Sequence, residues 1–359
     1  FNGLPAEIVA IIIKYAAEPT FVQDEDFHPT HSYRTARKLC LVSRTLRHFA
    51  LPIMLHTVVL DYQNMPAFLH ALRMQNEYAQ THPALRFEYT PHVRNIWIGP
   101  CLDVCPSDAP VDSSLTSEPV SDLDLIAPVL LGASSLAIYF SCLNLLTSCI
   151  ERAWTRMDKN IDNGSLPLPW KTKTLTLSRM TSDSWEMAKL ASGSAFLASI
   201  THFIALPPEE HDALLHILLR TKRAIGPQNY GTPLWMSDVP WNSFEKLEKV
   251  SLVFPRVQLP FDMFAYNWRA EQHAEVLTLP SSMLKGRRVP VLIRGSKGTE
   301  EGSLDNDAVL SGADCISLND VHVAVSDRPV LFCGCDICLH SDWEQVWASG
   351  LQAEGKWGL

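Results

Sequence analysis

The chain has 359 residues, of which 47% are hydrophobic, and it carries a formal net charge of −9. This length and apolar content are sufficient for a large core and predict about two domains. The acidic balance disfavours nucleic-acid binding, which requires a basic face, and the absence of any run of about 18 apolar residues disfavours a membrane span, so we expect neither partner.

A first helix is predicted over residues 4–17, LPAEIVAIIIKYAA, because a proline suits its first turn and apolar residues recur at three- and four-residue steps. The apolar face that these steps define consists of Leu4, Ile8, Ile11, Ile12 and Tyr15. Residues 18–32 contain two prolines and an acidic cluster, and they predict a loop.

A second helix is predicted to begin near Tyr33, with a further helical turn at Leu51 and Pro52. Its apolar stripe consists of Leu39, Val42, Leu46 and Phe49. Its other positions are strongly basic, and they are Arg34, Arg37, Lys38, Arg44 and Arg47.

Strands and helices alternate through the rest of the chain. The predicted strands are His56–Tyr62, Val93–Gly99, Lys173–Ser178, Ile200–Leu206, Leu247–Phe254 and Val289–Arg294. The predicted helices are Met65–Tyr78, Asp122–Met157, Ser184–Leu190, Glu209–Lys222 and Phe261–His273. This alternation predicts an α/β fold with parallel βα units. The segments 101–119 and 295–307 are polar and predict loops.

The spacing of the predicted strands is irregular. Their starts at residues 56, 93, 173, 200, 247 and 289 are separated by 37, 80, 27, 47 and 42 residues, whereas a regular solenoid has a fixed period. Two interpretations remain open, namely a degenerate repeat array with helices of variable length and one irregular α/β domain.

One cysteine cluster is considered as a metal site. The segment CGCDICLH contains Cys333, Cys335, Cys338 and His340, and one pair has the C-x-x-C spacing of half a zinc site. No second such pair occurs, and all four residues lie within eight positions, so we expect a turn of thiols and no metal. The total of nine cysteines is odd and small, which indicates a reducing compartment, cytoplasmic or nuclear.

No catalytic motif is present. The chain lacks G-x-S-x-G, G-x-G-x-x-G and the phosphate-binding G-x-x-x-x-G-K-[ST]. SGSAF at 192–196 is not a nucleophile elbow, because an elbow needs glycines on both sides of its serine. We therefore predict no catalytic residue and no cofactor. An α/β enzyme of hydrolase type with dispersed catalytic residues remains the alternative.

The two N-terminal helices together resemble the F-box, in particular the F-box-like domain of many fungal F-box proteins. Leu4-Pro5 and Glu7-Ile8 match its opening LP-x-E-[IL], and the segment 39–44 matches its centre L-x-x-V-[SC]-[KR]. The tail matches at Phe49, Pro52 and Leu55, with His56 in place of the usual aromatic residue. The following strand–helix units resemble the leucine-rich class of F-box proteins.

The resemblance implies an F-box-like domain at 1–56 and an irregular leucine-rich-repeat-like region at 57–359 that captures a protein substrate. An F-box docks on the adaptor Skp1 in a cullin–RING ubiquitin ligase, so the implied function is that of a non-catalytic substrate-recognition subunit. The expected Skp1-binding residues are Leu4, Pro5, Ile8, Ile12, Leu39, Val42, Ser43, Leu46, Pro52 and Leu55. A repeat scaffold that does not bind Skp1 is a further alternative.

A last helix is expected in the C-terminal segment DWEQVWASGL. Trp343, Val346 and Trp347 would form a short apolar face on it, and we expect that face to cap the repeat stack.

Overall fold

The computed structural model describes residues 4–18, 20–23, 29–100, 122–158, 168–178, 182–206, 229–230, 239–255, 270–272, 274–280, 291–293, 315–317, 322–325, 330–332 and 347. The predicted loops at 101–119 and 295–307, the predicted helix Glu209–Lys222 and the cysteine cluster at 333–340 lie outside these residues.

Three helices form the N-terminal region: α1 (Ala6–Ala17), α2 (Arg34–Val42) and α3 (Arg44–His56). The predicted second helix is therefore two helices. Ser43 separates them because its backbone is extended, with φ −158° and ψ 161°, and its Oγ accepts a hydrogen bond of 3.1 Å from the N–H of Leu46. A serine that caps a helix in this way starts a new helix and ends the preceding one.

The predicted loop at 18–32 contains two short strands. They are β1 (Thr20–Gln23) and β2 (Pro29–Ser32), which pair in antiparallel register.

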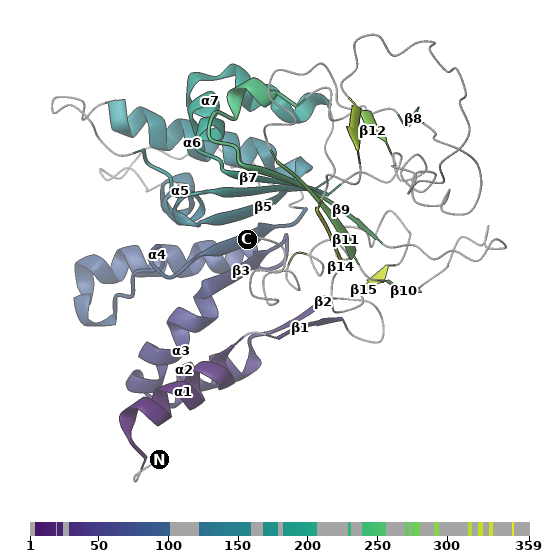
Figure 1. Ribbon diagram of the computed structural model, residues 1–359. Helices are drawn as coiled ribbons and strands as arrows, with labels where there is room; N and C mark the ends of the chain where they lie inside the picture. The colour runs from purple at the N-terminus through teal and green to yellow at the C-terminus, as the bar shows by residue number, and fades with distance from the viewer. Residues whose placement is uncertain are drawn as a thin grey trace, which may run out of the picture.

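The body is built on an eight-stranded sheet in the order β14-β11-β9-β7-β6-β5-β4-β3 (Figure 1). Six of its strands are parallel and follow one another in chain order: β3 (Thr57–Leu60), β4 (Asn95–Ile98), β5 (Ser135–Tyr139), β6 (Thr174–Ser178), β7 (His202–Leu206) and β9 (Lys249–Pro255). β11 (Ala274–Pro280) and β14 (His322–Val325) extend the sheet in antiparallel fashion. The predicted α/β class with parallel strands is confirmed.

Helices connect the parallel strands and pack side by side (Figure 1). They are α4 (Met65–Thr81), α5 (Asp122–Gly132), α6 (Leu143–Asp158) and α7 (Ala191–Ala198), with 3₁₀ turns at η1 (Pro83–Leu85), η2 (Phe140–Cys142), η3 (Ser182–Lys189) and η5 (Trp241–Ser243). Each of the helices α4, α5 and α6 contacts the α-helix that follows it. Among the described residues, no helix is both long and apolar enough to cross a membrane.

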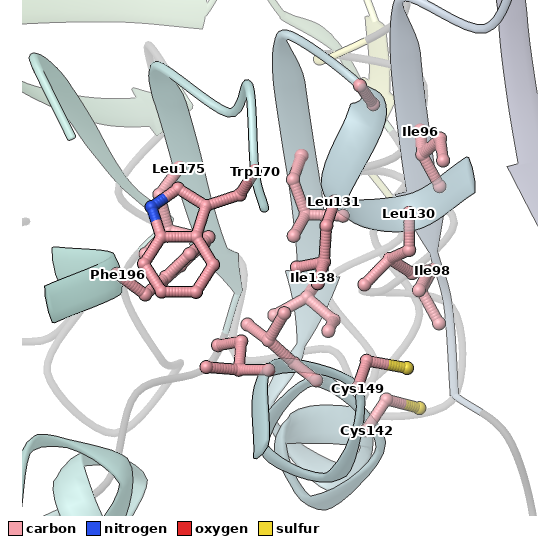
Figure 2. Close-up of a cluster of buried hydrophobic side chains, with 14 of the residues drawn as sticks. Ile96, Ile98, Leu130, Leu131, Ile138, Cys142, Cys149, Trp170, Leu175 and Phe196 are labelled. Atoms are coloured by element: carbon pink, nitrogen blue, oxygen red, sulfur yellow. The ribbon is translucent and has the colours of Figure 1, made fainter. Parts of the chain in front are cut away.

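The main core fills the space between these helices and one face of the sheet. Alternate strand residues such as Ile96, Leu136 and Leu175 point into it, because successive side chains of a strand lie on opposite faces. Leu130 of α5 and Phe196 of α7 meet them from the helical side, as Figure 2 shows. The body thus buries one face of its sheet under a row of helices.

The strand β5 is a correction to the predicted helix Asp122–Met157. That segment holds α5, β5, η2 and most of α6. The segment is apolar almost throughout, and periodicity does not distinguish a short apolar strand from part of a buried helix. The strand could therefore not be predicted from this pattern. Gly132, where α5 ends, is a local signal of a break.

With β5 included, the first strand spacings become nearly equal. β3, β4, β5 and β6 start at residues 57, 95, 135 and 174, which are separated by 38, 40 and 39 residues. The next two steps, to β7 at 202 and β9 at 249, are 28 and 47 residues. The predicted irregularity therefore belongs only to the second half of the parallel sheet.

The strand predicted at Val289–Arg294 is confirmed as β12 (Val291–Ile293), which pairs with β13 (Cys315–Ser317) and β8 (Asn229–Tyr230) in a sheet separate from the main one. One further prediction in the C-terminal third differs from the structure. The described end of the helix predicted at Phe261–His273 is instead a strand, β10 (Ala270–Gln272), paired with β15 (Val330–Phe332).

Candidate docking surface

The helix α1 is apolar on two faces. Val9, Ile13 and Ala17 recur at four-residue steps and pack inward against a small core that includes Ala36 of α2 and Ala50 of α3. The alanines let the three helices approach closely. The predicted apolar face of α1, from Leu4 to Tyr15, points to solvent instead. A monomeric helix usually has one apolar face, which packs on its neighbours. The second apolar face of α1 therefore has no covering element among the described residues.

The break at Ser43 divides the predicted stripe of the second helix in the same way. Leu39 and Leu46 pack against the small core, whereas Val42 is 70% exposed and its neighbour Leu41 is 87% exposed. Phe49 of α3 is also exposed. A single helix would have placed the four residues of the stripe on one face, and two helices do not.

The exposed apolar side chains are concentrated in these three helices and the turn before α1. Eight of the eleven large apolar side chains that are exposed among the described residues lie between residues 4 and 49. We call this set the N-terminal apolar surface; it consists of Leu4, Ile8, Ile11, Ile12, Tyr15, Leu41, Val42 and Phe49. Such a concentration of exposed apolar groups typically marks an interaction site.

The other expected Skp1-binding residues lie in different environments. Pro5 is exposed at the start of α1, and Ser43 is an exposed cap. Pro52 lies half-buried inside α3, where it removes one backbone donor. Leu55 is buried in the main core beside the sheet, so its side chain is not on the N-terminal apolar surface.

The surface around α2 and α3 is basic. All five Lys and Arg side chains of these helices are exposed, and no ion pair is found for them among the described residues. No Asp or Glu occurs from residue 33 to residue 60. Among the described residues, α2 and α3 therefore form a locally basic surface in a chain of net charge −9.

Burial shifts the pKa values of two titratable groups beside the N-terminal apolar surface. Burial raises the pKa of the Cys40 thiol, which the nearby Arg47 partly offsets. Burial also lowers the pKa of His56, and the Arg94 guanidinium lowers it further. Both groups are therefore held in their neutral forms near pH 7, and neither contributes a charge to the surface.

Helix α3 joins the small core to the body. Ala50 packs in the small core, while Leu51 and Leu55 pack in the main core. His56 ends the helix and Thr57 begins β3 without a linker. The predicted domain boundary at residue 56 thus falls where α3 passes directly into β3.

One buried histidine–serine pair bears on the enzyme alternative. His202 Nε2 lies 2.8 Å from Ser251 Oγ, and burial lowers the pKa of His202 to about 4, with a smaller contribution from Lys249. Among the described residues no group partners His202 Nδ1, whereas a catalytic triad orients this atom with an acid. Ser251 lies inside β9, between β7 and β11, and not at a strand-to-helix turn.

No metal site is found in the part of the chain that the structure describes, where no three His, Cys, Asp or Glu side chains are placed to hold an ion. Comparison with protein-family models, curated proteins and solved structures finds no match for the chain.

Sequence reasoning overlooked part of the surface. Leu41, the most exposed of its residues, and Phe49, Ile11 and Tyr15 were not among the expected binding residues. The available signal was the presence of apolar residues on more faces of α1 and α2 than one small core could cover.

Proposed function

We propose that the chain is a non-catalytic substrate-recognition subunit of a Skp1–cullin–F-box ubiquitin ligase. Its N-terminal helices dock on a Skp1-like adaptor, and its body captures a protein substrate. The single observation that carries the proposal is the N-terminal apolar surface, which is centred on the segments that resemble an F-box.

The geometry of the three helices supports this role. Leu41 and Val42 lie at the end of α2, directly before the Ser43 cap, and no described element covers them. Burying one Leu or Val side chain contributes roughly 1.5–3 kcal/mol. A partner that covered several of these side chains would therefore gain enough free energy for stable association.

The body of this adaptor is proposed to be a short solenoid of βα units. The support is the equal spacing of β3 to β6, the chain-order sequence of the parallel strands and the stepwise packing of α4 to α7. Stacked units of this kind bury a continuous core and leave an extended face for a partner.

Binding of the purified chain to Skp1, measured by isothermal titration calorimetry, tests the proposal. We expect the double substitution Leu41→Ala/Val42→Ala to weaken binding by about tenfold or more, because two exposed apolar anchors are truncated. The matched control is Leu85→Ala, which truncates an exposed leucine in η1 outside the surface and should leave binding unchanged.

Far-UV circular dichroism must show that both variants are folded. If the wild-type chain does not bind Skp1, the adaptor proposal fails, and the scaffold alternative without Skp1 binding takes its place. If binding occurs but the double variant binds as tightly as the control, the contact lies elsewhere on the chain.

A further inference from the structure

Strand β3 lies at one edge of the eight-stranded sheet, with β4 beside it. An edge strand presents a row of backbone N–H and C=O groups that can pair with a strand of another chain. This edge is nevertheless covered, because none of the four residues of β3 is more than 8% exposed. The groups that cover it therefore control whether the edge can pair.

The backbone hydrogen bonds show which carbonyl groups of β3 face this edge. The carbonyl groups of His56 and Leu60 accept hydrogen bonds of 3.0 and 2.8 Å from the N–H groups directly before and directly after β4, so both point toward β4. Alternate residues of a strand direct their backbone groups to opposite sides. The carbonyl groups of Thr57 and Val59 therefore point away from the sheet.

Two side chains satisfy these outward carbonyl groups. The Tyr33 hydroxyl donates a hydrogen bond of 2.8 Å to the Thr57 carbonyl oxygen, and Asn64 Nδ2 donates one of 3.0 Å to the Val59 carbonyl oxygen. Tyr33 directly precedes α2, so it belongs to the N-terminal region, whereas Asn64 directly precedes α4. Both outward acceptors of β3 thus have a partner that is not a strand.

The turn between β3 and α4 holds the Asn64 amide in this orientation. Its Oδ1 accepts a hydrogen bond of 2.9 Å from the Asp61 N–H. In return, Asp61 Oδ1 accepts hydrogen bonds of 2.8 Å from the N–H groups of Gln63 and Asn64. With its oxygen fixed by the backbone, the amide directs its nitrogen at Val59.

The N-terminal helices also pack at the β3 end of the body. Leu51 and Leu55 of α3 belong to the main core, and α3 leads directly into β3 (Figure 1). Cys40 of α2 and Met54 of α3 are half-buried and pack against both the small core and the main core. A stack of βα units requires a cap at its end, and α2 and α3 lie in that position.

The C-terminal segment was expected to cap the stack, and its described residue lies elsewhere. Trp347, the one residue of 342–351 that the structure describes, packs on Trp97 of β4, with ring centroids 5.6 Å apart and an interplanar angle of 46°. Because β4 has a strand on each side, this contact is on the sheet and not at its β3 edge. The cap at this edge is formed by Tyr33 and Asn64.

We propose that the N-terminal region has a second function as the cap of the sheet, and that Tyr33 and Asn64 keep the β3 edge from pairing with a second copy of the chain. Two identical edges meet across a two-fold axis, which sets β3 antiparallel to the β3 of the other copy. This function goes beyond adaptor docking and does not depend on it. Its test uses no Skp1, so the two proposals can fail separately.

Sedimentation velocity of the full-length chain and of the double variant Tyr33→Ala/Asn64→Ala tests the proposal. Removing both side chains uncovers the outward carbonyl groups, so we expect the dimer Kd to fall at least about tenfold below that of the wild-type chain. The matched control is Tyr62→Ala/Gln63→Ala, which removes an exposed tyrosine and an exposed amide from the turn after β3 and should leave the Kd unchanged.

A further substitution locates the new contact. The N–H of Val59 points to the same side as its carbonyl group, away from β4, and a proline is tolerated in an edge strand at such a position. Val59→Pro alone should therefore stay folded, and unfolding would contradict the outward direction of this N–H. Added to Tyr33→Ala/Asn64→Ala, it removes a donor to the second copy, and the dimer Kd should return to the wild-type value.

Three outcomes overturn the proposal. One is equal self-association by the wild-type chain and a double variant that far-UV circular dichroism shows to be folded. Another is a dimer of the double variant that persists with Val59→Pro, because the contact then lies elsewhere, such as on the N-terminal apolar surface. If the double variant does not fold, Tyr33→Phe/Asn64→Ser takes its place. Failure of this milder pair to fold, or to associate more tightly than the wild-type chain, is the third.

Discussion

Ile12 and Ile13 are neighbours in α1 with opposite environments. The Ile12 side chain is 40% exposed, whereas Ile13 is 2% exposed and belongs to the small core. Because both side chains are isoleucines, substituting each in turn distinguishes an effect on partner binding from an effect on stability.

We expect Ile13→Ala to lower the free energy of unfolding by about 2–5 kcal/mol, because it leaves a cavity between α1, α2 and α3. Ile12→Ala should change stability by about 0.5 kcal/mol or less and should weaken Skp1 binding. Urea unfolding and calorimetry on both variants measure the two effects. A large stability loss for Ile12→Ala would contradict the exposure of this face.

His202 predicts a pH dependence of stability. Burial lowers its pKa from 6.5 in the unfolded chain to about 4 in the folded chain, so the unfolded chain binds more protons below pH 6.5. The contribution to stability is therefore complete above pH 6.5 and is lost as the pH falls toward 4. Between pH 7 and pH 5 this one group should account for about 2 kcal/mol.

Urea unfolding at the two pH values, with His202→Asn as the reference, measures this contribution. The variant should lose about 2 kcal/mol less stability than the wild-type chain over the same interval. Equal losses would show that His202 is protonated without cost in the folded chain.

At the scale of the elements, α5 is tied to both neighbouring helices through its first turn. Asp122 pairs with Arg73 of α4 at 2.6 Å, and Asp124 pairs with Arg152 and Arg156 of α6, each at 2.6 Å. The Asp124 side chain is only 9% exposed, whereas that of Asp122 is 34% exposed. Both are aspartates in the first turn of α5, but water screens the ion pair of Asp122 more strongly than those of Asp124.

Asp124→Asn should therefore lower the free energy of unfolding by about 1–3 kcal/mol, since it removes two shielded ion pairs. Asp122→Asn should cost less than about 1 kcal/mol, as exposed pairs do. Thermal and urea unfolding of the two variants provide the comparison, and an equal effect would contradict the difference in burial.

The α5–β5 region also shows how an element was missed. The predicted helix Asp122–Met157 was right about α5 and α6 and wrong about β5, because the apolar sequence continues through all three. Propensity identified the helical ends, but only pairing with β4 and β6 makes Ser135–Tyr139 a strand. Sheet pairing is a long-range contact that a local pattern does not contain.

At the scale of the whole molecule, the charge is unevenly distributed. The chain has a net charge of −9, yet the stretch from residue 33 to residue 60 carries five Lys and Arg residues and no acid. Electrostatic attraction between this basic region and a partner with an acidic surface would act mainly on the rate of encounter.

We expect the association rate with Skp1 to fall by about tenfold when NaCl is raised from about 50 to 500 mM, while the dissociation rate changes little. Stopped-flow fluorescence measures both rates. The double substitution Arg37→Glu/Lys38→Glu should weaken this salt dependence. An association rate that is insensitive to salt would indicate that these cations do not face the adaptor.

The sequence alone determined the class of most elements of the N-terminal region and of the parallel sheet. The N-terminal helices, five of the six parallel strands and α4 follow from local periodicity, capping and β-propensity, and the α/β class follows from their alternation. The basic character of α2 and α3 is also visible in the sequence. These properties depend on residues close together in the chain, so a local pattern contains them.

The tertiary structure decided which apolar face of α1 is covered, how Ser43 divides Leu39 from Val42, and that Trp347 reaches Trp97. Periodicity reveals that a helix has apolar faces, but it does not reveal which face finds a neighbour. That outcome depends on contacts between residues distant in sequence, and these contacts separate Ile13 in the core from Ile12 on the surface.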